Sequence, residues 1–116
     1  MAKHNKLAKE GELIAFMILQ RDGFTILETN WRFQKSEIDI IAKKDGFLIF
    51  TEVKTRGGKK FGKLSDAIDK KKIALYKDAV GGYLEQDPSE AEIRFDVINI
   101  FIGKDETQIE HIPSAF

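Results

Sequence analysis

The sequence predicts an α/β fold in which helices cover both faces of a mixed β-sheet. Two observations support this prediction. Segments with helical periodicity alternate with short segments rich in strand-forming residues, and the strand at residues 47–54 is apolar on both faces in its first half, as expected of a central strand. The predicted order is helix, three strands, helix and strand, within a single domain over residues 1–116.

The first helix is predicted over residues 6–21. Asn5 can cap its N-terminus, apolar residues recur at helical spacing, and Gly23 can take the left-handed conformation that follows many helices. Residues 24–30 come next and are rich in strand formers, which predicts the first strand. Trp31 follows this strand, and we interpret it as a core or rim aromatic residue.

The next two strands are predicted to form a hairpin. They cover residues 37–43 and 47–54, and the Asp-Gly dipeptide at 45–46 is a strong signal for a tight turn. Antiparallel pairing about this turn places Asp39 opposite Glu52. Like charges that face each other destabilise a ladder, so the pattern favours a cation that neutralises them.

The second half of the chain predicts one helix and one clear strand. The helix begins at Ser65, a capping residue, and runs to about Leu84, with the glycine pair at 81–82 as its weak point. Residues 92–101 form the strand, and a last short strand fits residues 108–112. These elements complete the predicted sheet.

Composition excludes several classes of function. The chain has no cysteine, which excludes disulfides, thiolate metal sites and thiol catalysis, and fits a cytoplasmic protein. It has no apolar run long enough to cross a membrane. The net charge is zero, but residues 43–77 hold eleven Lys and Arg against four acidic residues. This segment predicts a basic surface for a phosphate backbone, with a solvated face as the alternative.

The end of the third strand carries residues suited to phosphodiester chemistry. Glu52 and Lys54 share one face of the strand by alternation, and the hairpin brings Asp39 beside them. Mg²⁺ prefers carboxylate oxygens, so Asp39 and Glu52 are the candidate metal ligands, and Mn²⁺ can substitute. Lys54 is the candidate that holds the attacking water and offsets charge on the phosphoryl oxygens. An ion pair at a strand end is the alternative.

These residues resemble the PD-(D/E)xK nuclease signature, here Ile38-Asp39, a gap of twelve residues, and Glu52-Val53-Lys54. Nearly the whole chain resembles the YraN-like bacterial proteins, a family akin to archaeal Holliday-junction resolvases. The resemblance includes Gly11-Glu12, Asn30-Trp31-Arg32, Glu37-Ile38-Asp39, Arg94-Phe95-Asp96-Val97 and the closing His111-Ile112-Pro113-Ser114-Ala115-Phe116. The chain departs from these families at Ile38, where the superfamily has proline, and at Ser36, where the close family has glycine.

The resemblance implies a restriction-endonuclease-like three-layer fold and a metal-dependent DNA endonuclease that acts on branched or structured DNA. It also implies that Glu12, on the first helix, is the fourth polar member of the site, whereas the sequence alone fits a solvated helix residue equally well. Junction resolvases cut two strands as dimers, so a homodimer is compatible with the family. Glu37 is interpreted as a structural contact rather than a metal ligand.

Basic residues near the predicted site are candidates for binding DNA. The stretch at residues 54–63 has five basic residues and no acidic one, and the second helix begins with a run of lysines. The candidates are Arg56, Lys59, Lys60, Lys63, Lys71 and Lys72. For the lysines on the helix, plain solvation is an equal alternative.

Other residues are interpreted as structural. Asp96 lies within the strand at 92–101 and is interpreted as a structural hydrogen-bond acceptor. His4 and His111 lack the spaced partners of a zinc site or a catalytic triad, and no role is assigned to them.

Two other functions remain compatible with the sequence. The first is a nucleic-acid-binding module that has the nuclease fold but cleaves little or not at all. The second is an interaction protein in which the acidic residues only form ion pairs. A fold does not by itself determine function, so these alternatives need a biochemical test.

Overall fold

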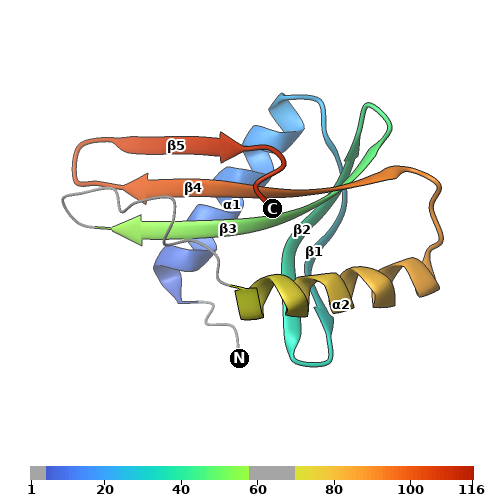
Figure 1. Ribbon diagram of the computed structural model, residues 1–116. Helices are drawn as coiled ribbons and strands as arrows, with labels where there is room; N and C mark the ends of the chain where they lie inside the picture. Colours follow the sequence, from blue (N-terminus) through green and yellow to red (C-terminus); the bar gives the residue numbers. More distant parts are fainter. Residues whose placement is uncertain (1–4, 58–69) are drawn as a thin grey trace.

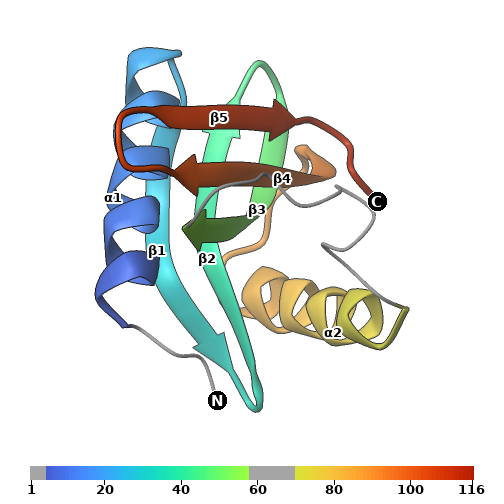
Figure 2. The same cartoon turned by 90° about the vertical axis from the view of Figure 1, so that its left-hand side faces the viewer.

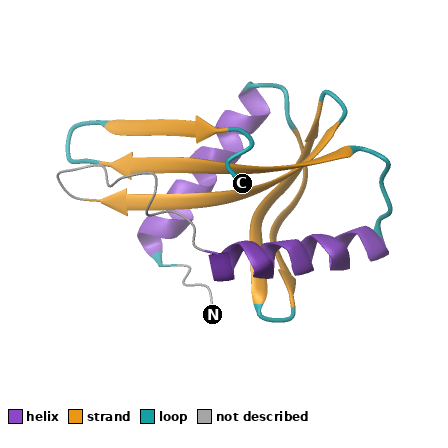
Figure 3. Cartoon of the chain, viewed as in Figure 1, coloured by secondary structure: helices purple, strands orange, loops and turns teal. Residues whose placement is uncertain are grey.

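The computed structural model describes residues 5–57 and 70–116 and has two helices and a five-stranded mixed sheet (Figures 1 and 3). The elements are α1 (Lys6–Arg21), β1 (Thr25–Phe33), β2 (Ser36–Lys44), β3 (Phe47–Gly57), α2 (Lys70–Gln86), β4 (Glu92–Ile102) and β5 (Thr107–Ile112). All the predicted elements are present, and β5 is the short last strand. Both β1 and β3 extend three residues beyond their predicted ends, so Trp31 lies within β1 rather than after it.

The sheet has the order β1-β2-β3-β4-β5, with β3 at its centre. β3 is antiparallel to β2 and parallel to β4, and the other neighbouring pairs are antiparallel. A parallel pair needs a long connection between its strands, and here that connection contains α2. The prediction of a mixed sheet with a central third strand is confirmed.

The two helices cover opposite faces of the sheet (Figures 1 and 2). Ala15 and Leu19 of α1 pack in one buried cluster with Ile49 of β3. Residues of α2, including Tyr83, pack in a second cluster with Phe50, the next residue along β3. Because successive side chains of a strand point to opposite faces, these two clusters lie on the two sides of the sheet.

The β2–β3 hairpin has the predicted turn and the predicted register. Asp45 and Gly46 both have positive φ, 51° and 85°, as a two-residue hairpin turn of this type requires. The ladder continues as far as the pair of Ile40 and Thr51. Beyond it the two strands diverge, because β2 continues beside β1 and β3 continues beside β4 (Figure 1). Asp39 therefore occupies the first position after the ladder ends.

Simple alternation fails in β2 near Asp39. Regular alternation would place Ile38 and Ile40 on the same face, but Ile38 packs in the α2 cluster and Ile40 in the α1 cluster. On the neighbouring strand, Asn30 has a φ of 50°, a left-handed conformation that redirects a strand. The strand pair therefore turns at this point, and the turn brings Asp39 to the gap between β2 and β3.

The second helix extends slightly beyond its predicted end at about Leu84. The predicted start at Ser65 lies outside the described residues, and the described helix continues to Gln86. The glycine pair at 81–82 does not interrupt it. A Cβ atom on Gly82 would lie 2.2 Å from Cε1 of Phe33, so the glycine lets α2 pack closely on β1. Close packing against the sheet thus outweighs the low helix propensity of this residue.

The C-terminal segment folds back onto the sheet and reaches α2. The backbone amide of Ala115 donates a hydrogen bond to the carbonyl oxygen of Phe95 at 2.7 Å. The ring of Phe116 stacks on Phe95, with centroids 4.8 Å apart, and also contacts Tyr76 of α2 at 5.9 Å. Phe116, which is far from Tyr76 in the sequence, therefore packs against the ring of Tyr76 and helps to hold it in place. Across residues 5–57 and 70–116, neither helix is long and apolar enough to span a membrane.

Candidate active site

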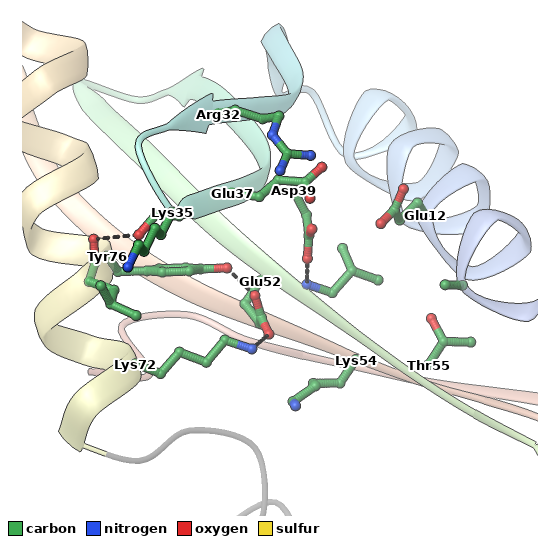
Figure 4. A pocket seen from close by; sticks show the side chains of 14 residues that line it. Glu12, Arg32, Lys35, Glu37, Asp39, Glu52, Lys54, Thr55, Lys72 and Tyr76 are labelled. Atoms are coloured by element: carbon green, nitrogen blue, oxygen red, sulfur yellow. Dashed lines mark hydrogen bonds and ion pairs between the residues drawn. The ribbon is translucent and has the colours of Figure 1, made fainter. Parts of the chain in front are cut away.

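A cavity of about 420 Å³ lies where β2 and β3 diverge, between α1 and α2 (Figure 4). Its lining includes acidic and basic side chains from four elements: Glu12 of α1, Asp39 of β2, Glu52 and Lys54 of β3, and Lys72 and Tyr76 of α2. The structure therefore places the four residues predicted to act in catalysis or metal binding around one cavity.

Asp39 is held at the gap between the strands by the backbone of β3. Its Oδ2 accepts a hydrogen bond from the backbone N–H of Val53 at 2.7 Å, where a strand partner would otherwise accept one. Burial raises the pKa of Asp39 well above its ordinary value, and the charge of Glu52 raises it further. The bond from Val53 only partly offsets the rise. An additional positive charge would therefore stabilise the ionised form of Asp39.

Glu52 is the most enclosed acidic group of the cavity, with 5 % of its surface exposed. Two side chains of α2 hold its two carboxylate oxygens. The ammonium of Lys72 forms an ion pair with Oε2, and the hydroxyl of Tyr76 donates a hydrogen bond to Oε1 (Figure 4). Burial raises the pKa of the Tyr76 hydroxyl well above its ordinary value, and the charge of Glu52 adds to this rise, so Tyr76 stays a neutral donor.

Lys54 lies two residues beyond Glu52, and its side chain lines the same cavity (Figure 4). Lys54 is half-buried, so its charge is only partly screened by solvent. It is placed to act on a group that enters the cavity.

Glu12 reaches the cavity because α1 packs very closely on β3. A Cβ atom on the preceding residue, Gly11, would lie 1.9 Å from Oγ1 of Thr55, so only glycine fits at this contact. The side chain of Asn30 donates a hydrogen bond to Oε1 of Glu12 at 3.1 Å. Asn30, at the kink in β1, thus holds the carboxylate of Glu12 on the α1 side of Asp39, opposite α2.

The candidate DNA-binding residues are in different situations. Lys72 is paired with Glu52, whereas Lys71 is exposed. Arg56 lies near the end of β3 and is half-buried. The remaining candidates, Lys59, Lys60 and Lys63, lie outside the described residues. Glu37 lines the cavity beside Asp39 (Figure 4).

The structure adds residues that sequence reasoning did not assign to the site. Tyr76 holds Glu52, and Arg32 and Lys35 line the cavity. The Ser36 hydroxyl donates to the carbonyl oxygen of Leu75 at 3.1 Å and so ties the start of β2 to α2. Two of these residues carried a signal in the sequence: Arg32 belongs to the Asn-Trp-Arg segment of the family resemblance, and Ser36 stands where the close family has glycine.

Asp96 on β4 is fully buried and lies at the centre of a separate cluster of polar contacts. Its oxygens accept two hydrogen bonds from Arg94 at 2.9 and 2.8 Å and one from the backbone of Ser114 at 3.1 Å, and His111 contacts it at 2.7 Å. Burial alone would raise the pKa of Asp96, but the bonds from His111 and Arg94 outweigh it and hold the pKa below its ordinary value. The structural role predicted for Asp96 is confirmed, and His111 gains one.

The acidic residues do not form a complete metal site as they stand. In the described part of the chain, no three His, Asp or Glu side chains are grouped as ligands for an ion. Among the acidic residues of the cavity, Glu52 has the strongest effect on the pKa of Asp39, because its charge raises that pKa more than the charge of Glu12 or Glu37 does. Two carboxylates with waters and a substrate phosphate are enough for Mg²⁺, which seldom uses a full set of protein ligands.

Comparison with known proteins places the chain in a family. Residues 11–100 match the sequence model of the family described as "Uncharacterised protein family UPF0102". The chain belongs to the UPF0102 family. A UPF0102 protein of Flavobacterium psychrophilum is 47 % identical to it over 116 residues, which cover 100 % of this chain and 98 % of the relative. A UPF0102 protein of Christiangramia forsetii is 46 % identical over the same shares of both chains.

A UPF0102 protein of Syntrophomonas wolfei is 36 % identical over 97 % of this chain and 99 % of the relative. The resemblance to the YraN-like proteins is therefore confirmed at the level of the family. The part that matches the UPF0102 model includes every residue placed around the cavity above, and it ends before His111.

Proposed function

We propose that this UPF0102 protein is a metal-dependent DNA endonuclease whose sheet and helices form a restriction-endonuclease-like fold. The observation that carries the proposal is the convergence of Asp39, Glu52 and Lys54 on one cavity. Two acidic groups and one ammonium, brought together from two diverging strands, are the groups needed for hydrolysis of a phosphodiester bond with a divalent cation.

The donor groups of the cavity fit Mg²⁺ or Mn²⁺. Asp39 uses one oxygen to accept the bond from Val53, and its pKa is raised by burial and, next, by the charge of Glu52, so a cation would stabilise its ionised form. Each carboxylate oxygen has two lone pairs, so Glu52 can accept a hydrogen bond and bind a cation with the same oxygen. Asp39 and Glu52 would hold the ion, which when bound lowers the pKa of water and polarises the phosphoryl oxygen.

The side chains of the protein supply the remaining functions. Lys54 faces the cavity and would hold the attacking water and offset the charge that develops on the phosphoryl oxygens. Glu12 would hold a water on the α1 side, where Asn30 fixes its carboxylate. Arg56 and the lysines of the adjacent segment would bind the DNA backbone. Branched DNA and a homodimer are proposed from the family resemblance.

One observation favours a second candidate function, a DNA-binding module that cleaves little or not at all. Both oxygens of Glu52 are already engaged, by Lys72 and by Tyr76. If Lys72 stays on Glu52 with DNA bound, its positive charge repels a divalent cation from the acidic pair of Asp39 and Glu52. Binding would then need no divalent cation.

A cleavage assay on linear duplex, single-stranded and four-way DNA in Mg²⁺ and in Mn²⁺ tests the proposal. We expect cleavage by the wild type, and a loss of about 100-fold or more in Asp39→Asn and in Lys54→Ala. The binding-module function predicts DNA binding without cleavage, with the same affinity in Glu52→Ala.

Matched controls lie at the other end of the same hairpin. Asp45→Asn removes an acidic charge and keeps a residue that tolerates the left-handed turn, and Lys43→Ala removes an exposed ammonium. Both variants should cleave as the wild type does. Equal cleavage by the wild type, Asp39→Asn and Lys54→Ala would point to a contaminating nuclease and remove the proposed mechanism.

A further inference from the structure

The contacts of Glu52 with α2 are of two different kinds. Lys72 and Tyr76 are four residues apart, so they lie one above the other on one face of α2, and each holds one oxygen of Glu52 (Figure 4). The first is a cation and the second is a neutral donor. They therefore respond in opposite ways when another positive charge approaches the same carboxylate.

Tyr76 is firmly held and cannot easily leave Glu52. Its side chain is almost fully buried and packs against the ring of Phe116. A neutral hydroxyl orients a carboxylate without repelling a cation bound to it. Tyr76 can therefore hold Glu52 in one position whether or not the acidic pair carries a divalent ion.

Lys72 is in the opposite situation. Its side chain is 39 % exposed, at the rim of the cavity, whereas the side chain of Glu52 is 7 % exposed. The ammonium supplies one positive charge to Glu52, and Asp39, a second acidic side chain, lines the same cavity. A divalent ion on the same acidic pair would repel this ammonium, and the long flexible side chain could turn towards solvent.

We propose that Tyr76 is the positioning residue of Glu52, and that Lys72 is an internal counter-cation that leaves Glu52 when the acidic pair takes up a divalent cation and then binds a DNA phosphate. This inference rests on the proposed function and deepens it. Lys72 keeps the buried acidic group neutralised before DNA and metal arrive, and it becomes a phosphate contact only afterwards. Metal uptake and DNA binding are thereby coupled through one side chain.

The first test measures Mn²⁺ affinity by titration calorimetry without DNA, so that it does not depend on cleavage. Lys72→Met removes the competing charge and should tighten Mn²⁺ binding by about threefold to tenfold. Tyr76→Phe should weaken it by about threefold or more, because Glu52 loses its fixed orientation. Lys71→Met removes the neighbouring, exposed lysine of α2 and should leave the affinity unchanged.

Two further variants keep the test decisive. If Lys72→Met fails to fold because Glu52 is left buried without a cationic partner, Lys72→Gln keeps a second donor for Glu52 and should also tighten Mn²⁺ binding. Lys72→Arg keeps the positive charge and should stay within about twofold of the wild type. Unchanged or weaker Mn²⁺ binding in folded Lys72→Met or Lys72→Gln overturns the role of Lys72.

The second test measures how DNA affinity depends on salt, in EDTA and in Ca²⁺, a cation that seldom supports cleavage at such sites. In Ca²⁺, Lys72→Met should lower the slope of log affinity against log salt by about 0.9, the value for one lost phosphate contact. In EDTA the slope should not change, because Lys72 is then on Glu52. Equal slope changes in both conditions would contradict the exchange of partners.

The proposed function and this inference can fail separately. If the wild type and Asp39→Asn bind Mn²⁺ equally weakly, the acidic pair is not a metal site and both proposals fall. If the wild type binds Mn²⁺ through Asp39 while the Lys72 variants match the wild type, only the inference falls.

Discussion

Asp39 and Asp96 are both shielded from solvent, yet their surroundings shift their pKa values in opposite directions. Asp96 is fully buried, and Arg94, His111 and Ser114 satisfy it so well that its pKa is lowered. Asp39 accepts a hydrogen bond from Val53, and burial together with the charge of Glu52 raises its pKa. Burial alone therefore does not mark a functional residue. A buried carboxylate that has too few positive groups around it is a much better indicator of a functional residue.

The largest expected contrast is in cleavage. Per mole of folded protein, Asp39→Asn should lose about 100-fold or more, whereas Asp96→Asn should stay within about threefold of the wild type, because Asp96 lies outside the cavity. Initial rates on the best DNA substrate, with the folded fraction measured by circular dichroism, check this. A similar loss of cleavage in both variants would show that the contrast between Asp39 and Asp96 does not distinguish a catalytic carboxylate from a structural one.

The effects of the same two substitutions on stability should have the reverse order, with the larger loss in Asp96→Asn. Asp96→Asn leaves Arg94 without a carboxylate partner, so the free energy of unfolding should fall by about 2 to 3 kcal/mol. In EDTA, Asp39→Asn should be as stable as the wild type or more stable by about 1 kcal/mol, because it removes a charge that its site disfavours. Urea unfolding at neutral pH measures both values. A clear loss in Asp39→Asn would mean that the carboxylate is structural.

The pH dependence of stability sharpens the same contrast, since the two pKa values move in opposite directions from 3.8. Asp39 has a raised pKa in the folded state, so its contribution is full below 3.8 and is lost as pH rises through the raised value. Asp96 has a lowered pKa, so its contribution is present above 3.8 and is lost as pH falls through the lowered value.

In EDTA, the advantage of Asp39→Asn over the wild type should therefore grow with rising pH, and the deficit of Asp96→Asn should shrink in acid. Unfolding free energies from pH 3 to pH 8 measure both trends. Parallel curves for the two variants and the wild type would contradict the opposite pKa shifts.

The smallest expected effect comes from Glu12, whose charge also raises the pKa of Asp39. Glu12→Gln should stabilise the protein in EDTA by about 0.5 kcal/mol at neutral pH. Glu10→Gln is the matched control on the same helix, because Glu10 is exposed, and it should change nothing measurable. If both variants behave alike, Glu12 does not act on the acidic pair.

Much of the fold could be predicted because it depends on local signals. Asn5 caps α1 by accepting from the backbone of Ala8 at 2.7 Å, and the Asp-Gly turn at 45–46 sets the register of the hairpin. That register in turn predicted that Asp39 and Glu52 lie near each other. Alternation failed where Asn30 takes a left-handed conformation, because no local pattern announces a kink inside a strand.

The contacts made by α2 could not be predicted from the sequence. Which face of a helix meets a strand depends on packing between distant segments, such as Gly82 against Phe33. For this reason Lys72 was predicted to bind DNA, while the structure pairs it with Glu52, and Tyr76 was not assigned to the site. The acidic residues of the site could be identified from the sequence, but the contacts of Lys72 and Tyr76 with Glu52 could not.

The bond from the Val53 amide to Asp39 gives the protein an internal reporter. The proton of this amide lies between the two diverging strands and is hydrogen-bonded to the carboxylate of Asp39. Its NMR chemical shift and its rate of exchange with deuterium should change when Asp39 gains a proton or moves. One backbone resonance could thus follow the state of the carboxylate in solution, without a label, a substrate or a mutation.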